Sequence, residues 1–129
     1  MNSHLPILEY HDVTEEASSR GAHSPYVMHM QTFLVHMEWL YSQGYRTASL
    51  DDLAYGRTQD KTVVLTFDDG DRSNHRLVFP LLQQFGFMGT FFIVAGRVGQ
   101  RNNDTGQEYM DWSEIKELNN HGMKIESHS

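Results

Sequence analysis

The sequence predicts an α/β fold in which helices cover a sheet of parallel strands. Segments with the patterns of strands and helices alternate along its 129 residues, with short links and no internal repeat. Residues 62–67 (TVVLTF) and 89–94 (GTFFIV) are almost continuously apolar or β-branched, as expected for strands buried on both faces. An open sheet and a barrel both agree with this pattern, and the length suits one domain, residues 1–129.

The first half of the chain is expected to supply a strand, a helix and two shorter elements. Residues 6–11 (PILEYH) predict a strand, and residues 12–25 predict a polar loop. Apolar residues at helical spacing, followed by a glycine that suits a left-handed cap, predict an amphipathic helix. These residues are Phe33, Met37, Leu40, Tyr41 and the capping Gly44. A short strand at 46–50 and a helical turn at 51–55 complete this half.

The segment between the two buried strands, residues 74–85, predicts a helix that ends near Gly86. We expect this helix to bend at Pro80, because proline lacks the backbone N–H that a helix uses. Residues 95–110 then form a long loop rich in glycine and asparagine, and loops of this length often carry function.

The last helix is predicted by a capping signal. Asp111 is followed three residues later by Glu114, the pattern of a reciprocal N-terminal cap, so residues 112–121 should be helical. The helix should stop at Gly122, and residues 124–127 should form a final short strand.

Composition narrows the function classes. A net charge of −7 argues against nucleic acid as a partner, because such proteins need a surplus of Lys and Arg. No apolar run approaches the roughly 18 residues of a transmembrane segment, and the first residues lack a signal peptide pattern. Zero cysteines exclude disulfides and thiolate metal sites, leaving His, Asp and Glu as strong metal ligands. The compartment is not decided by the sequence.

Ionisable residues follow three of the predicted strands. His11 follows the first strand, Asp68 and Asp69 follow residues 62–67, and His128 follows the last strand. Because ligands bind at the carboxyl ends of parallel strands, we expect these side chains to share one rim. Two carboxylates can divide metal binding and proton transfer between them, and imidazole suits zinc, cobalt or nickel. The pattern indicates a metal-dependent hydrolase.

Simpler interpretations compete with this one. Asp-Asp-Gly is a common turn in which Gly70 takes a positive φ, and an isolated histidine is usually a solvated surface residue. That background is expected to include six histidines: His4, His23, His29, His36, His75 and His121. Three aromatic residues are expected to pack in the core rather than to bind sugar: Phe91, Phe92 and Trp112.

Several ordered motifs resemble one known family. TFDDG at 66–70, FPLLQQFGFMGTFFIV and MDWSEIKELNNHGMKIESHS together resemble the polysaccharide deacetylases, the NodB-homology domain of carbohydrate esterase family four. ILEYHDV and YVMHMQTFLVHMEWLYSQGYRTASLDDL are similar to members that act on poly-N-acetylglucosamine. The resemblance implies a deformed (β/α) barrel, truncated here to its N-terminal part.

The resemblance also implies roles for residues of this chain. Asp68 would be the catalytic base, and Asp69 and His128 would bind the divalent metal, with zinc favoured and cobalt or nickel as alternatives. A second metal-binding histidine and the general acid of the family would lie beyond Ser129, so we expect weak metal binding and little activity from this chain alone. Asp71 and His75 depart from the residues that are common in the family, which affects expected substrate contacts.

The implied activity is hydrolysis of a linear amide bond, with removal of N-acetyl groups from a polysaccharide or oligosaccharide. Two alternatives remain open: a hydrolase of small cyclic amides on the same barrel, and a non-catalytic remnant that binds glycan or a partner. The family usually works at the cell envelope or outside the cell. A half-barrel would expose strand edges, so a homo-oligomer that covers them is a further expectation.

Overall fold

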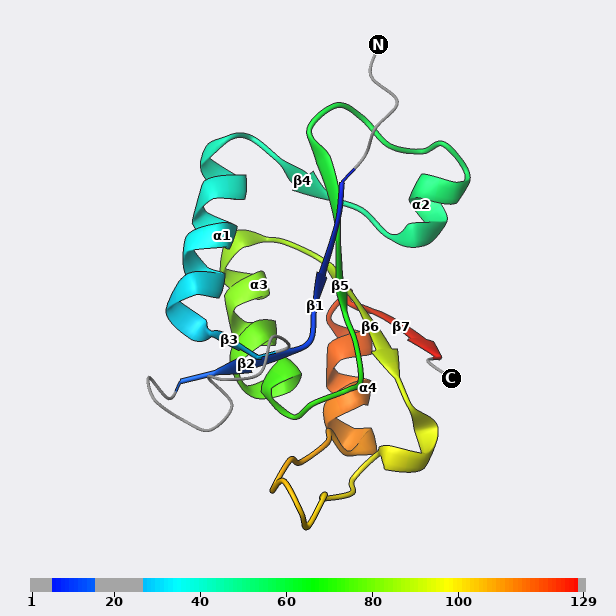
Figure 1. Cartoon of the computed structure of the whole chain (residues 1–129). Helices are drawn as coiled ribbons and strands as arrows, with labels where there is room; N and C mark the ends of the chain where they lie inside the picture. The colour runs from blue at the N-terminus through cyan, green and yellow to red at the C-terminus, as the bar shows by residue number, and fades with distance from the viewer. Residues whose placement is uncertain (1–5, 16–26, 128–129) are drawn as a thin grey trace.

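The fold is built on one sheet in which every described strand pairing is parallel. The computed structural model describes residues 6–15 and 27–127 of the chain. Four strands follow one another in the sheet (Figure 1): β1 (Ile7–Tyr10), β5 (Thr62–Phe67), β6 (Gly89–Ile93) and β7 (Lys124–Ser127). The two-residue strand β4 (Arg46–Thr47) also pairs with β5. The prediction of an α/β fold with parallel strands is confirmed.

A second, two-stranded sheet lies beside the first and was not predicted. β2 (Asp12–Thr14) lies inside the region expected to be a polar loop, and it pairs in parallel with β3 (Val27–His29), which follows that region. The loop prediction is therefore wrong for residues 12–14. Val13 explains why this segment is a strand and not a loop, because its side chain is buried in the core and holds the segment against it.

Helices connect the strands and cover the sheet. In Figure 1, α1 and α3 lie next to each other, and α4 precedes β7 and packs against it. The helical elements are α1 (Met30–Ser42), α2 (Leu50–Ala54), the π-helical turn η2 (Asn74–Val78), α3 (Phe79–Phe85), the 3-10 turn η3 (Ala95–Arg97) and α4 (Trp112–Asn120).

Helix α1 has the predicted face and the predicted end. Phe33, Met37 and Leu40 are buried, and Gly44 follows the helix with φ +80°. Tyr41 differs from the expectation, because 61% of it is exposed and its ring lies against Phe85 near the end of α3.

The helix expected at 74–85 is divided into two parts. η2 has the wider π-helical turn, and α3 continues directly from it with Pro80 in its first turn. Pro80 stands in the first turn of α3, where a missing backbone N–H is best tolerated. The irregularity in this segment is a π-helical turn ahead of Pro80, and the predicted bend at Pro80 stays a prediction.

Helix α4 begins with the predicted capping box. The Asp111 side chain accepts a hydrogen bond from the backbone N–H of Glu114, and Glu114 accepts one from the N–H of Asp111. Trp112, the first residue of the helix, is 61% exposed, so its prediction as a core residue is wrong. The inward face of α4 is instead made by Ile115 and Leu118.

Aromatic rings form the centre of the core. The Phe67 ring on β5 stacks between Phe91 of β6, at 4.7 Å between centroids, and Tyr10 of β1, at 5.4 Å. Phe33 of α1 meets Tyr10 edge to face at 5.1 Å. Each such pair contributes about 0.5–1.5 kcal/mol beyond its buried area. Phe91 is thus a core residue as predicted, whereas Phe92 is only half-buried.

Candidate active site

The ends of β1 and β5 bring His11 and Asp68 together. The two strands are in parallel register, with Tyr10 opposite Phe67, and the Asp68 N–H donates to the Tyr10 carbonyl at 2.9 Å. The next side chains along each strand meet, with His11 Nε2 lying 3.6 Å from Asp68 Oδ2. Both side chains are largely buried, at 23% and 12% exposed. The predicted convergence of these two residues is confirmed.

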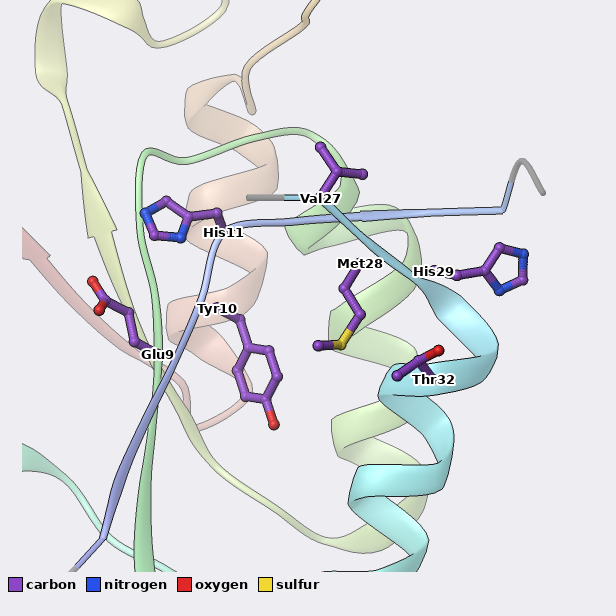
Figure 2. Close-up of a pocket in the computed structure, with 7 residues that line it drawn as sticks. All are labelled: Glu9, Tyr10, His11, Val27, Met28, His29 and Thr32. Atoms are coloured by element: carbon purple, nitrogen blue, oxygen red, sulfur yellow. The ribbon is translucent and has the colours of Figure 1, made fainter. Parts of the chain in front are cut away.

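Glu9 belongs to the same cluster. One ligand atom from each of Glu9, His11 and Asp68 lies within 4.8 Å of the other two, a spacing that could hold a metal ion. Residues two apart on a strand project on the same side, so Glu9 and His11 share one face of β1. Figure 2 shows both side chains on one side of the strand and Tyr10 on the other. That alternation is the sequence signal for Glu9, which was not predicted as a site residue.

Asp69 and Gly70 form a tight turn directly after β5. Their φ angles are +77° and +72°, so both residues take the left-handed conformation. Aspartate visits this region more readily than most residues, but the conformation still carries strain of order 1 kcal/mol or more. The turn interpretation of Asp-Asp-Gly is therefore correct, and it coexists with a position at the rim that suits a functional site.

Asp12 adds a further acidic group beside this turn. Burial raises the pKa of Asp12 to about 7, and the negative charges of Asp71 and Asp69 raise it in the same direction. The donors gathered at the rim are carboxylate oxygens and one imidazole nitrogen, a set that suits Zn²⁺ and other divalent metals.

A cavity of about 320 Å³ opens beside this cluster (Figure 2). Glu9 and His11 contribute to its wall, together with His29 and Thr32 at the start of α1. Tyr10 lies between this cavity and the core, and burial raises the pKa of its hydroxyl to about 12.

His128 lies outside the described residues. The strand that precedes it, β7, pairs with β6 and runs in the same direction as β5. The role expected of His128 as a metal ligand remains a prediction.

The six background histidines fall into three groups. His4 and His23 lie outside the described residues, whereas His29 accepts the Gln31 N–H at the start of α1, and His36 and His121 are exposed. His75 is not a solvated surface residue, so its prediction is wrong. Its ring lies between Glu114, at 3.4 Å, and Glu117, at 2.8 Å.

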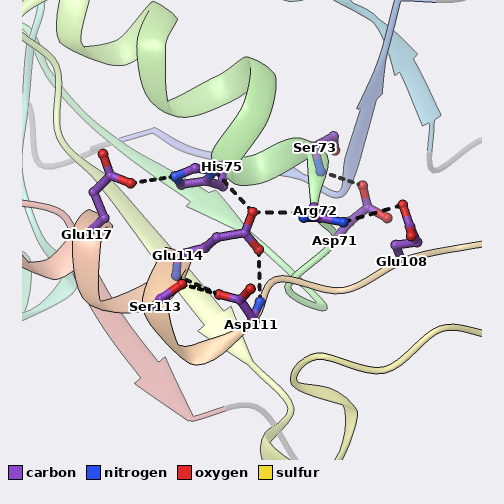
Figure 3. A network of polar contacts seen from close by, with 9 residues as sticks. All are labelled: Asp71, Arg72, Ser73, His75, Glu108, Asp111, Ser113, Glu114 and Glu117. Atoms are coloured by element: carbon purple, nitrogen blue, oxygen red, sulfur yellow. Dashed lines mark hydrogen bonds and ion pairs between the residues drawn. The ribbon is translucent and has the colours of Figure 1, made fainter.

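His75 is part of a network that joins η2 to α4 (Figure 3). Arg72 donates to Glu114 at 3.2 Å and pairs with Glu108 at 3.7 Å. Glu114 thus contacts both Arg72 and His75 while it also caps its own helix. This network lies just after the aspartate turn and fixes the helices that follow it.

The model of one protein family, polysaccharide deacetylase, matches residues 55–129 of the chain. The chain belongs to the polysaccharide deacetylase family. The matched residues include the aspartate turn and β7.

Curated relatives agree with this family assignment. A Bacillus subtilis protein named as a polysaccharide deacetylase, YxkH, is 32% identical over 97% of this chain and 42% of its own length. The poly-β-1,6-N-acetyl-D-glucosamine N-deacetylase of Staphylococcus aureus is 26% identical over 81% of the chain and 37% of its own length. The chain therefore spans less than half the length of these relatives.

Solved deacetylase structures share the fold. IcaB from Ammonifex degensii has a TM-score of 0.81 and 31% identity, and the match covers 96% of this chain and 52% of IcaB. The Streptococcus pyogenes deacetylase PplD, solved with acetate, has a TM-score of 0.82 at 21% identity, which shows the fold alone. The predicted family and its truncated barrel fold are confirmed. Among the described residues, no helix is both long and apolar enough to cross a membrane.

Proposed function

We propose that this chain carries the N-terminal part of the active site of a metal-dependent enzyme that removes N-acetyl groups from a glycan. The observation that carries the proposal is the pairing of Asp68 with His11 at the end of β5, directly before Asp69. Membership of the polysaccharide deacetylase family supports it, and so do relatives named for deacetylation of poly-N-acetylglucosamine.

The metal would be held by Asp69 and His128, as the family resemblance implies, and the carboxylate-rich rim suits such an ion. When bound, a divalent metal polarises the amide carbonyl and lowers the pKa of its bound water to about 7. Zinc is the metal that we propose, with cobalt and nickel as alternatives that share the same donors.

The residues of this chain would handle the proton. Asp68 would take a proton from the attacking water, whose oxygen forms a bond to the acetamide carbon. The C–N bond would then break as the amine nitrogen takes up a proton from the general acid that the family resemblance implies. The products are acetate and a free amine on the sugar, and the proton held by Asp68 is released to restore the acid. His11, 3.6 Å from Asp68, would orient the carboxylate and stabilise its charge. No serine or cysteine nucleophile takes part in this route.

The first test is the loss of the base. In a protein that contains the whole domain, Asp68→Asn should lower kcat for acetate release from N-acetylglucosamine oligomers by about 10²–10⁴-fold, the usual value of general base catalysis. Asp104→Asn is a matched control, because Asp104 is exposed in the loop before α4. An Asp68→Asn enzyme that keeps wild-type turnover would refute the assignment.

The second test is removal of the metal. A chelator such as EDTA should abolish acetate release, and added Zn²⁺ should restore it. Asp69→Ala should weaken Zn²⁺ binding about 10-fold or more, measured by calorimetry, because one charged ligand is lost. Full activity after exhaustive chelation would argue for a metal-free mechanism.

Glycan binding without catalysis is a second candidate, and Trp112 favours it. Its ring is 61% exposed, and the residue lies two positions after Met110, whose N–H donates to the Gly70 carbonyl in the aspartate turn. An exposed aromatic face near the site is a surface on which a sugar can stack. Oligosaccharide binding in the presence of chelator, with no acetate release under any metal, would favour this candidate.

A further inference from the structure

We propose that Asn74 and Gln107 are positioning residues that hold His11 against Asp68. The inference rests on the proposed function, because it assigns the two carboxamides to the site described above. Both side chains connect the turn from β1 into β2 (residues 11–13), which carries His11, to the segment between the end of β5 and the start of η2 (residues 68–74), which carries Asp68.

Asn74 fastens this turn from the core side. The residue is fully buried, and its Nδ2 donates to the His11 carbonyl at 3.1 Å. Its Oδ1 accepts no hydrogen bond within the described residues. Burying an amide group that makes only some of its possible hydrogen bonds costs free energy. The hydrogen bond to the His11 carbonyl is therefore the interaction that accounts for an asparagine at this position.

Ser73, the neighbour of Asn74, adds a second attachment. Its hydroxyl accepts the Val13 N–H at 3.1 Å, and its own N–H donates to Asp71 at 2.9 Å. The backbone groups on both sides of Asp12 are therefore bound by two consecutive side chains at the start of η2. Asn74 binds the His11 carbonyl, and Ser73 binds the Val13 N–H. This arrangement fixes the path of the backbone that leads away from His11.

Gln107 fastens the same turn from the side of the long loop. Its Nε2 donates to Asp12 at 3.2 Å and to Asp71 at 3.1 Å, while its Oε1 accepts from the Tyr109 hydroxyl at 3.1 Å. Two carboxylates that repel each other are thus bridged by one neutral group with two N–H donors. A glutamate at this position would have no proton to offer and would add a third negative charge.

The long loop is itself anchored, so Gln107 is not a freely moving group. The Arg72 N–H donates to the Glu108 carbonyl at 2.9 Å, and the Met110 N–H donates to Gly70 at 3.0 Å. These bonds place residues 107–110 against the aspartate turn. The 3.6 Å approach of His11 to Asp68 exceeds an ordinary hydrogen bond, so it depends on where the two backbones are held.

The first experiment needs no activity. In the 129-residue chain, the imidazole ¹⁵N resonances of His11 should shift when Asp68→Asn is introduced, because the two side chains touch. In proteins that also carry Asn74→Asp or Gln107→Glu, the change that Asp68→Asn causes in the His11 resonances should fall to less than about half of its size in the otherwise wild-type chain. The same shift in all backgrounds would overturn the positioning role.

Two variants serve as matched controls. Gln100→Glu makes the same charge change at an exposed position of the same loop, and Asn119→Asp does so for an exposed asparagine on α4. Both should leave the His11 response unchanged. If Asn74→Asp fails to fold because its site is buried, Gln107→Glu and the uncharged Gln107→Leu carry the test at a half-buried position.

The second experiment measures turnover in a protein that contains the whole domain. Asn74→Asp and Gln107→Glu should each lower kcat about tenfold or more with little change in KM, because small displacements of catalytic groups are costly. The effect should disappear in a His11→Ala background, since residues that act through one group are not additive. Full additivity would show a role independent of His11.

The two experiments separate the two hypotheses. Suppose that the wild-type domain is inactive, but Asn74→Asp and Gln107→Glu both abolish the change of the His11 resonances on Asp68→Asn substitution. This result would overturn the proposed function and uphold the positioning role. An active wild-type domain whose variants keep both their His11 response and their kcat would overturn the positioning role alone.

Discussion

At the scale of single residues, Gly89 shows how tightly the sheet is packed under the site. A Cβ atom at this position would lie 2.8 Å from Phe67 Cε2 and 3.0 Å from Leu82 Cδ1, closer than carbon atoms approach. Gly89→Ala should therefore destabilise the fold by about 1–3 kcal/mol through overpacking. Chemical denaturation would measure the free energy of unfolding.

Gly96 provides the control for this prediction. A Cβ atom there would meet no other atom within 4 Å, and its φ angle needs no glycine. Gly96→Ala should stay within about 0.5 kcal/mol of wild type. Equal stability of the Gly89→Ala and Gly96→Ala proteins would show that the core can accommodate the extra methyl group.

Single residues of the site were predictable to different degrees. Asp68 and His11 could be placed because each directly follows an apolar run, and parallel strands end on one rim. Gln107 could not be placed, because its role depends on a loop that folds back to Asp12 from 95 residues away in sequence. Local patterns carry no information on such a contact. Trp112 was misjudged because aromatic character indicates burial only on average.

At the scale of elements, the start of α4 depends on the charge of Asp111. Hydrogen bonds from the Ser113 hydroxyl and then from the Glu114 N–H hold the pKa of Asp111 below its ordinary value of 3.8. A carboxyl group whose pKa is lower in the folded state stabilises the fold at pH values above its pKa in the unfolded chain. This contribution is lost as the pH falls through the pKa of the folded state.

Two variants test this cap. Asp111→Asn should keep the melting temperature near neutral pH, since asparagine caps helices as well as aspartate does, and should lose less stability between about pH 5 and pH 3 than wild type. Asp111→Ala should lower the melting temperature at both pH values. An Asp111→Asn protein with the acid sensitivity of wild type would show that other carboxylates dominate.

Element types were more predictable than their details. The capping box of α4 and the buried pattern of β5 are local signals, and both were correct. The π-helical turn at residues 74–78 and the pairing of β2 with β3 are set by tertiary packing around Asn74 and Val13. Such packing overrides local preference and leaves no periodic trace in the sequence.

At the scale of the whole molecule, one edge of the sheet stands beside an apolar surface. Within the described residues β1 pairs only with β5, which leaves its other edge open. Val35 and Trp39 of α1 are 60% and 56% exposed and line a hollow of about 560 Å³ next to β1. Open edges with apolar neighbours favour association.

We expect two copies of the chain to associate through this surface. Sedimentation velocity at increasing concentration should show self-association, and Trp39→Lys should reduce it. Trp112→Lys is the matched control, because Trp112 is equally exposed but lies on α4. A wild-type chain that stays monomeric over the whole concentration range would contradict the prediction.

The parallel pairing of β1 with β5 also has a kinetic consequence. Ile7 is paired with Val64, so the contact that brings His11 to Asp68 joins segments more than fifty residues apart. Contacts of such long range form slowly, because the intervening chain must first lose its conformational freedom. During refolding, the central strands should gain protection from hydrogen exchange before β1 does. The rim formed by His11 and Asp68 would then be among the last regions to mature, after the hydrophobic interior has already condensed.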